Sequence, residues 1–341
     1  MNNRKKLVWQ LPFLALLIIG TVLIITHQRN MPYHTNHGEI FGTVYNVTYQ
    51  CDNDLHEEIK KALEEVDQSL SPFNPTSTIT KINNNESMKT DPMFVSVYNI
   101  SRKVSEETAG AFDITVAPLV NLWGFGFRKG TTPDDHTIDS LLNFVGYKKV
   151  ALKRDGTIEK SDPRIMLDCS AVAKGYGCDI VASVLRKHDV TNYMVEIGGE
   201  VVTKGLNPNR VPWKIGVNRP VDDPTQTSQE LQTVLNVTDK AMATSGNYRN
   251  FYYKDGKKYA HTIDPESGRP VSHSLLSATV LAADCATADA YATSFMVMGM
   301  DKARDVLKKH PELMAYFIYS DNKGDYKVWY SPSLADKIVD D

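Results

Sequence analysis

The sequence predicts an α+β fold, with a mixed, largely antiparallel sheet and packed helices, preceded by one N-terminal transmembrane helix. Two Asp-Gly pairs, at 155–156 and 255–256, each lie between short β-prone runs, as in antiparallel hairpins. Helical and strand-like patterns then alternate along the chain. The helical patterns cover 172–188 and 286–310, and the strand-like runs cover 193–197, 277–282 and 315–319. Hairpins interleaved with helices indicate the α+β class.

The first residues predict a membrane anchor. Arg4, Lys5 and Lys6 precede an apolar stretch at 7–26, which is long enough to cross a bilayer as a helix. By the positive-inside rule, residues 1–6 stay in the cytoplasm and the rest of the chain lies outside. No small-x-small cleavage site or lipid-accepting cysteine closes the stretch, which favours an uncleaved signal anchor over a cleaved signal peptide. We expect a single-pass membrane protein whose domain lies outside the cytoplasm.

The remaining chain is expected to form a short linker, 27–38, and one domain, 39–341. No internal repeat or second linker divides this domain. Helices are expected at 59–70 and from the N-cap pair Asp91-Pro92 to Gly110.

The composition excludes some classes of function. Of the 341 residues, 42% are hydrophobic, enough for one large core or two modest ones. Lys and Arg total 38 against 41 Asp and Glu, so no basic excess favours nucleic acid as a partner. The cysteines are too sparse for a disulfide framework and lack CxxC spacing, so we expect them to pack in the core, with a disulfide left open. They are Cys51, Cys169, Cys178 and Cys285.

Two segments carry groups suited to phosphate and metal. Asp168 ends a strand, and a turn of small residues leads into a helix that carries Lys174; amides at a helix start suit phosphate. Asp289 and Thr293 lie four residues apart on one helix face, so a carboxylate and a hydroxyl can bind Mg²⁺ together. For the first segment, the alternative is a tight strand-to-helix connection in which Lys174 is simply solvated. For the second, the alternative is that the Thr293 hydroxyl bonds to a carbonyl of its own helix while Asp289 pairs with a cation.

Two further segments add aromatic, acidic and basic groups. Phe112 and Asp113 follow the glycine that ends a helix, and Phe112 suits the core as well as a ligand site. His261 leaves a strand into a turn-rich loop, where an imidazole can accept a hydroxyl proton near neutral pH. A structural role is the alternative for a lone histidine.

Together these segments resemble the ApbE family of FAD:protein FMN transferases, from residue 39 to the C-terminus. The order and spacing of the motifs match the family, although relatives often carry methionine at Phe41 and tyrosine at Phe73. Both differences keep a large apolar group that can pack on a flavin ring. The motifs are Phe41-Gly42-Thr43, Ser69-Leu70-Ser71-Pro72-Phe73, Asn83, Ala111-Phe112-Asp113, Trp123-Gly124-Phe125, 168–175, Ile197-Gly198-Gly199-Glu200, Thr244-Ser245-Gly246-Asn247-Tyr248, 261–265 and 289–293.

The resemblance implies a role for individual residues. Mg²⁺ ligands are implied at Asp289, Thr293 and the backbone oxygen of Ala171, and His261 is our candidate general base. Contacts with FAD are implied for Phe41, Phe73, Ala111, Phe112, Asp113, Asp168, Lys174 and Ile263.

The implied activity is Mg²⁺-dependent cleavage of the FAD pyrophosphate, with transfer of FMN to a Ser or Thr hydroxyl of an acceptor flavoprotein and release of AMP. We expect the acceptor to be a membrane electron-transfer subunit, since an anchored enzyme lies beside such proteins. Two alternatives are an FAD pyrophosphatase, in which water accepts the FMN, and a non-catalytic flavin-binding surface protein. Aromatic Phe73 favours transfer, and Asp289, Thr293 and His261 together favour catalysis, because binding alone needs neither metal nor base.

Overall fold

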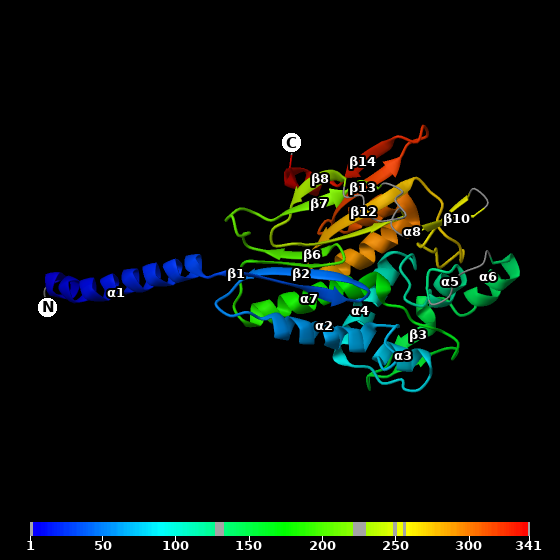
Figure 1. Ribbon diagram of the computed structural model, residues 1–341, viewed down its shortest axis with the longest axis horizontal. Helices are drawn as coiled ribbons and strands as arrows, with labels where there is room; N and C mark the ends of the chain where they lie inside the picture. Colours follow the sequence, from blue (N-terminus) through cyan, green and yellow to red (C-terminus); the bar gives the residue numbers. More distant parts are fainter. Residues whose placement is uncertain (1–2, 127–132, 221–229, 248–250, 255–256, 340–341) are drawn as a thin grey trace.

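An eight-stranded antiparallel sheet forms the centre of the protein (Figure 1). The computed structural model describes residues 3–126, 133–220, 230–247, 251–254 and 257–339. From edge to edge the strands are β1 (Tyr33–Ile40), β2 (Thr43–Gln50), β5 (Tyr193–Ile197), β6 (Glu200–Lys204), β9 (Ala241–Gly246), β12 (Leu275–Ala282), β13 (Met314–Ser320) and β14 (Tyr326–Tyr330). Each of these ladders is antiparallel. The predicted α+β class is confirmed, and the described part of the sheet is less mixed than expected.

Two long helices, α7 (Ser170–Lys187) and α8 (Cys285–Lys309), pack against the sheet and against each other. α8 lies on β9 and β12, α7 lies on β5 and β6, and α2 (His56–Leu70) covers α7. Alternate residues of β12 face opposite sides: Val280 joins the core under α8, whereas Leu281 joins a cluster with the smaller three-stranded sheet. Because both faces are covered, this strand is almost continuously apolar.

The remaining elements surround this centre. The helices are α3 (Thr78–Asn83), α4 (Pro92–Glu107), α5 (Ala117–Leu122), α6 (Asp135–Leu142) and the 3₁₀ turns η1 (Tyr147–Lys149) and η2 (Pro332–Lys337). The strands are β3 (Val150–Leu152) with β4 (Ile158–Lys160), β10 (Phe251–Lys254) with β11 (Lys257–Ala260), and the sheet β15 (Ile338–Val339), β8 (Leu231–Asn236) and β7 (Lys214–Asn218). All four cysteines are buried free thiols.

Local sequence signals located several of these elements correctly. Asp91 caps α4 by accepting hydrogen bonds from the Met93 and Phe94 amides, and Pro92 occupies the first turn. The β3–β4 hairpin encloses Asp155-Gly156 as predicted. β10 and β11 also pair as a hairpin, although its predicted turn, 255–256, lies outside the described residues.

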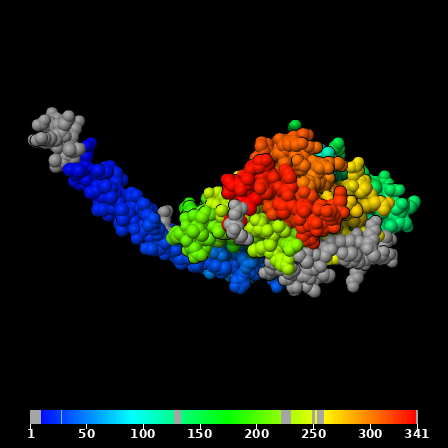
Figure 2. All heavy atoms as spheres, turned by 90° about the horizontal axis from the view of Figure 1, so that it is seen from above, coloured from blue at the N-terminus to red at the C-terminus, as the bar shows by residue number. Residues whose placement is uncertain are grey.

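The N-terminal region differs from the expected boundaries. α1 (Asn3–Asn30) extends past both ends of the predicted 7–26 span, and β1 begins at Tyr33, within the expected 27–38 linker. β1 has few apolar residues because it is an edge strand, which pairs with β2 through backbone groups. α1 projects from the body (Figure 2) and its window Gln10–His27, with mean hydropathy 2.0, is long and apolar enough to cross a membrane.

A glycine sets the distance between the two central helices. A Cβ on Gly175 of α7 would lie 2.3 Å from the backbone oxygen of Cys285 and 2.9 Å from the backbone nitrogen of Ala286 at the start of α8. A Cβ on Gly177 would lie 2.8 Å from the Phe41 ring. α7 therefore carries glycine where α8 and the β1–β2 turn approach most closely.

Gly175→Ala should lower the free energy of unfolding by about 1–3 kcal/mol, because the added methyl group meets backbone that cannot rotate away. Helix propensity alone predicts the opposite sign, a gain of up to about 1 kcal/mol. Urea unfolding of Gly175→Ala distinguishes these two predictions, with Ser183→Ala on the same helix as the matched control. A Gly175→Ala protein as stable as the parent would disprove the close crossing.

A protein truncated to residues 31–341 should be soluble and folded, because α1 contributes nothing to the core clusters of the described residues. Truncation to 39–341 removes most of β1, including buried Asn36, whose side chain bonds Tyr49 and Asp54. We expect it to be at least about 2 kcal/mol less stable. Thermal unfolding of the 31–341 and 39–341 proteins compares their stabilities. Equal stability would show that the domain begins at Glu39, as the sequence predicts.

Candidate active site

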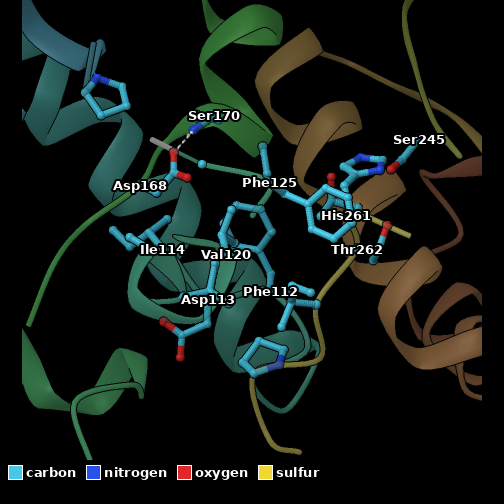
Figure 3. A pocket seen from close by; sticks show the side chains of 18 of the residues that line it. Phe112, Asp113, Ile114, Val120, Phe125, Asp168, Ser170, Ser245, His261 and Thr262 are labelled. Atoms are coloured by element: carbon cyan, nitrogen blue, oxygen red, sulfur yellow. Dashed lines mark hydrogen bonds between the residues drawn. The ribbon is translucent and has the colours of Figure 1, made fainter. Parts of the chain in front are cut away.

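A cavity of about 450 Å³ opens beside the first turns of α7 and α8. Its lining includes every residue to which the sequence analysis assigns a role; their roles stay predictions. From α7 and α8 come Ala171, Lys174, Asp289 and Thr293, from the segment just before α7 comes Asp168, and from other connecting segments come Phe41, Phe73, Ala111, Phe112, Asp113, His261 and Ile263. Figure 3 shows part of this lining.

Asp289 and Thr293 offer oxygen ligands on one face of α8. The Asp289 side chain is buried, and its Oδ2 accepts a hydrogen bond of 3.1 Å from the Gly175 amide. The Thr293 hydroxyl makes no hydrogen bond with the described residues, whereas the neighbouring Ser294 hydroxyl donates back to the Ala290 carbonyl at 2.7 Å. Thr293 is therefore not bonded to its own helix, as the alternative interpretation required.

Ala171 completes a set of hard oxygen donors. In a regular helix the Gly175 amide donates to the Ala171 carbonyl; here its bond to Asp289 competes with that interaction. A carboxylate, a hydroxyl and a carbonyl suit Mg²⁺ and leave positions for water and phosphate oxygens. In the described ranges, no group of three or more His, Cys, Asp or Glu could hold a metal. The donor set thus fits one Mg²⁺ that depends partly on neutral oxygens.

Lys174 is held by a carboxylate to which the sequence analysis assigned no role. Its Nζ lies 2.6 Å from Oε1 of Glu200 at the start of β6, and the Glu200 side chain is only 2% exposed. Lys174 is therefore not simply solvated. Burial raises the pKa of Asp289, while the charge of Lys174 and the Gly175 amide act in the opposite direction. One ammonium group thus lies near two buried carboxyl groups.

The other two acids in the lining differ in their freedom to bind a ligand. Asp168 Oδ1 accepts a hydrogen bond of 2.8 Å from the Ser170 amide, drawn dashed in Figure 3, and its side chain is half-buried at the cavity wall. Asp113 is buried, and its oxygens accept bonds from Thr115 and the Tyr147 amide. Burial raises the pKa of Asp113, and these bonds oppose the rise. The Asp113 carboxylate therefore supports the loop.

The aromatic and apolar groups form two kinds of surface. Phe112 and Ile263 are almost fully buried, so only an edge of each reaches the cavity. Phe41 lies over Gly177, and Phe73 is 68% exposed at the rim. The interior fits an apolar ring system, and the exposed Phe73 leaves the rim open to a second molecule.

His261 lies on the cavity wall opposite Asp168. Figure 3 shows its ring beside Phe125, with centroids 6.4 Å apart and an edge-on angle of 70°. Phe125, Val120 and Ser245 also line the cavity, although no role is predicted for them from the sequence. The available signal for Phe125 and Ser245 was their place in the motifs 123–125 and 244–248, whereas Val120 carries no such signal.

The family comparison agrees with this geometry. The ApbE family profile matches residues 41–317. The FAD:protein FMN transferase of Vibrio cholerae is 37% identical over 292 residues, which is 81% of this chain and 85% of that protein. The Haemophilus influenzae FAD:protein FMN transferase is 36% identical over 301 residues, or 84% and 86% of the two chains.

Solved structures extend the similarity to the fold. The flavin transferase ApbE of Vibrio cholerae superimposes with a TM-score of 0.81 at 34% identity, covering 90% of this chain and 99% of that one. The flavinyl transferase ApbE of Pseudomonas stutzeri, in its apo form, superimposes with a TM-score of 0.80 at 27% identity, covering 90% of this chain and 97% of that one. With both its sequence and its fold matched over most of its length, the chain belongs to the ApbE family.

Proposed function

We propose that this protein is an FAD:protein FMN transferase that uses Mg²⁺ and transfers FMN to a Ser or Thr hydroxyl of an acceptor flavoprotein. The observation that carries the proposal is one cavity whose lining brings together a buried carboxylate on α8, a hydroxyl on α8 that makes no hydrogen bond with the described residues, and a histidine from the loop after β11. Membership of a family whose similar relatives are named for this activity supports it. A binding protein would need neither the metal ligands nor the base.

The proposed reaction is a phosphoryl transfer. The acceptor hydroxyl oxygen forms a bond to the FMN phosphorus, the phosphoanhydride bond to AMP breaks, and the hydroxyl proton passes to His261. Asp289, Thr293 and the Ala171 carbonyl would hold Mg²⁺. The ion would supply positive charge that offsets the charge of the pyrophosphate and of the leaving phosphate.

The remaining lining residues bind and orient FAD. Lys174, fixed by Glu200, places a positive charge beside the phosphates. Asp168 contacts FAD from the cavity wall. The apolar groups Phe41, Ala111, Phe112 and Ile263 receive the flavin, with Phe73 at the rim. Positioning of this kind supplies much of the rate enhancement in phosphoryl transfer.

We also propose where the reaction takes place. α1 anchors the protein in the bacterial inner membrane with residues 1–6 in the cytoplasm and the domain in the periplasm, which the apolar window of α1 and the preceding Arg4, Lys5 and Lys6 support. A membrane electron-transfer subunit is then the expected acceptor. The exposure of Phe73 at the rim supports contact with an acceptor there.

One incubation tests the activity. The 31–341 protein, FAD and MgCl₂ are mixed with solubilised membranes from a bacterium that lacks a flavin transferase, and protein-bound flavin fluorescence and AMP are measured. We expect equal amounts of bound flavin and AMP. Free FMN with AMP would show a pyrophosphatase instead, and unchanged FAD would show a binding protein.

Asp289→Asn should lower the rate of flavin attachment by roughly 10²–10³-fold, since a metal ion contributes several kcal/mol and this carboxylate is the only anion among its protein ligands. Asparagine keeps the shape and an acceptor for the Gly175 amide. Asp284→Asn, at the N-cap of α8 and outside the cavity, is the control and should remain active. Near-normal turnover of Asp289→Asn at low Mg²⁺ would rule out the proposed metal site.

His261→Ala should lower the attachment rate by about 10²–10⁴-fold while FAD affinity stays nearly unchanged, because a general base acts only in the chemical step. Activity of the parent protein should also fall on acidification, since a protonated imidazole cannot accept a proton. His188→Ala, a surface histidine paired with Glu58, is the control. If FAD affinity falls in proportion to the rate, His261 is a binding residue, and Asp264 becomes the next candidate base.

A further inference from the structure

A continuous row of aromatic rings ends on His261. Trp123 stacks on Tyr259 with centroids 5.6 Å apart, Tyr259 stacks on Tyr252 at 5.3 Å, and Tyr252 stacks on Phe125 at 5.3 Å. Phe125 then meets the His261 ring edge-on at 6.4 Å. We propose, building on the transfer reaction above, that Phe125 is a positioning residue that fixes the orientation of the His261 imidazole.

The row is anchored at its buried end. Trp123 is 3% exposed, and its indole nitrogen donates a 2.8 Å hydrogen bond to the Gly268 carbonyl. This bond ties the end of α5 to the loop that follows His261. Gly268 itself packs tightly, because a Cβ there would lie 2.6 Å from Ile138. The loop carrying His261 is thus held from both sides, by Tyr259 in β11 before it and by Gly268 after it.

Phe125 is the member of the row that reaches the cavity and contacts the imidazole. One side of its ring is occupied by Tyr252, so it cannot turn away from His261 without breaking a stacked contact. Aromatic pairs prefer defined offset or edge-on arrangements, which makes such a contact directional. Figure 3 shows the two rings side by side, Phe125 reaching the cavity from the segment after α5 and His261 from the loop after β11. Phe125 therefore restricts the plane in which the imidazole nitrogens lie.

Because Phe125 also lines the cavity, direct contact with FAD is the competing explanation. A double-mutant cycle separates the two. Phe125→Ala should lower the attachment rate by roughly 10–10²-fold, as misplaced catalytic groups do, with FAD affinity little changed. In the His261→Ala background the same substitution should have almost no further effect, since the group it orients is gone. Phe125→Tyr keeps the ring and should restore most of the rate.

The matched control is Phe144→Ala, another half-buried phenylalanine, which lies outside the cavity lining. A second measurement does not depend on turnover: the imidazole signals of His261, assigned by comparison with His261→Ala, should shift in the NMR spectrum of Phe125→Ala and not in that of Phe144→Ala. Three results would overturn the inference. They are a fall in FAD affinity that matches the fall in rate in Phe125→Ala, an equally large fall in rate when Phe125→Ala is added to His261→Ala, and imidazole signals that do not change in Phe125→Ala. Absence of transfer by the parent protein would overturn the proposed function instead, and the NMR comparison would still test the positioning contact.

Discussion

The close crossing of α7 and α8 at Gly175 is the constraint on which the site depends. Without a side chain there, the backbone of α7 touches the start of α8, and the Gly175 amide reaches the buried carboxylate of Asp289. Ala171 and Lys174 thereby face the same cavity as Asp289 and Thr293. A small change in the helix separation would alter every distance among the proposed metal and phosphate ligands, because close-packed cores transmit displacement.

The charges around this crossing suit the proposed Mg²⁺ ion and the phosphates of FAD. Lys174 lies between two buried carboxyl groups, pairing with Glu200 and interacting with Asp289. Buried charges are stable only when they are paired, so the ammonium group supports both acids in the absence of a ligand. A divalent cation on Asp289 would take over part of that role and let Lys174 interact with phosphate oxygens.

The cavity combines a base of packed helices with loops that bring the proposed reactive and recognition groups. The base consists of α7 and α8, packed on the central sheet. His261, Phe112 and Phe73 come from connecting segments, of which the His261 loop is held by the Trp123 bond to Gly268. Functional groups on loops positioned by a rigid scaffold are common in enzymes. The exposure of Phe73 contrasts with the burial of Phe112, so the rim and the interior of the cavity suit different molecules.

The sequence by itself determined the α+β class, the central helices, the Asp91 cap, the β3–β4 hairpin and part of the lining of the cavity. Each of these depends on a local signal, such as helical periodicity or turn-forming residues, or on motifs in a matching order. Only the tertiary structure decided the rest. β1 was missed because an edge strand needs few apolar residues, and the pairing of Lys174 with Glu200 and the ring row to Phe125 join residues far apart in the chain. Contacts of this kind arise from packing, which no local pattern in the sequence specifies.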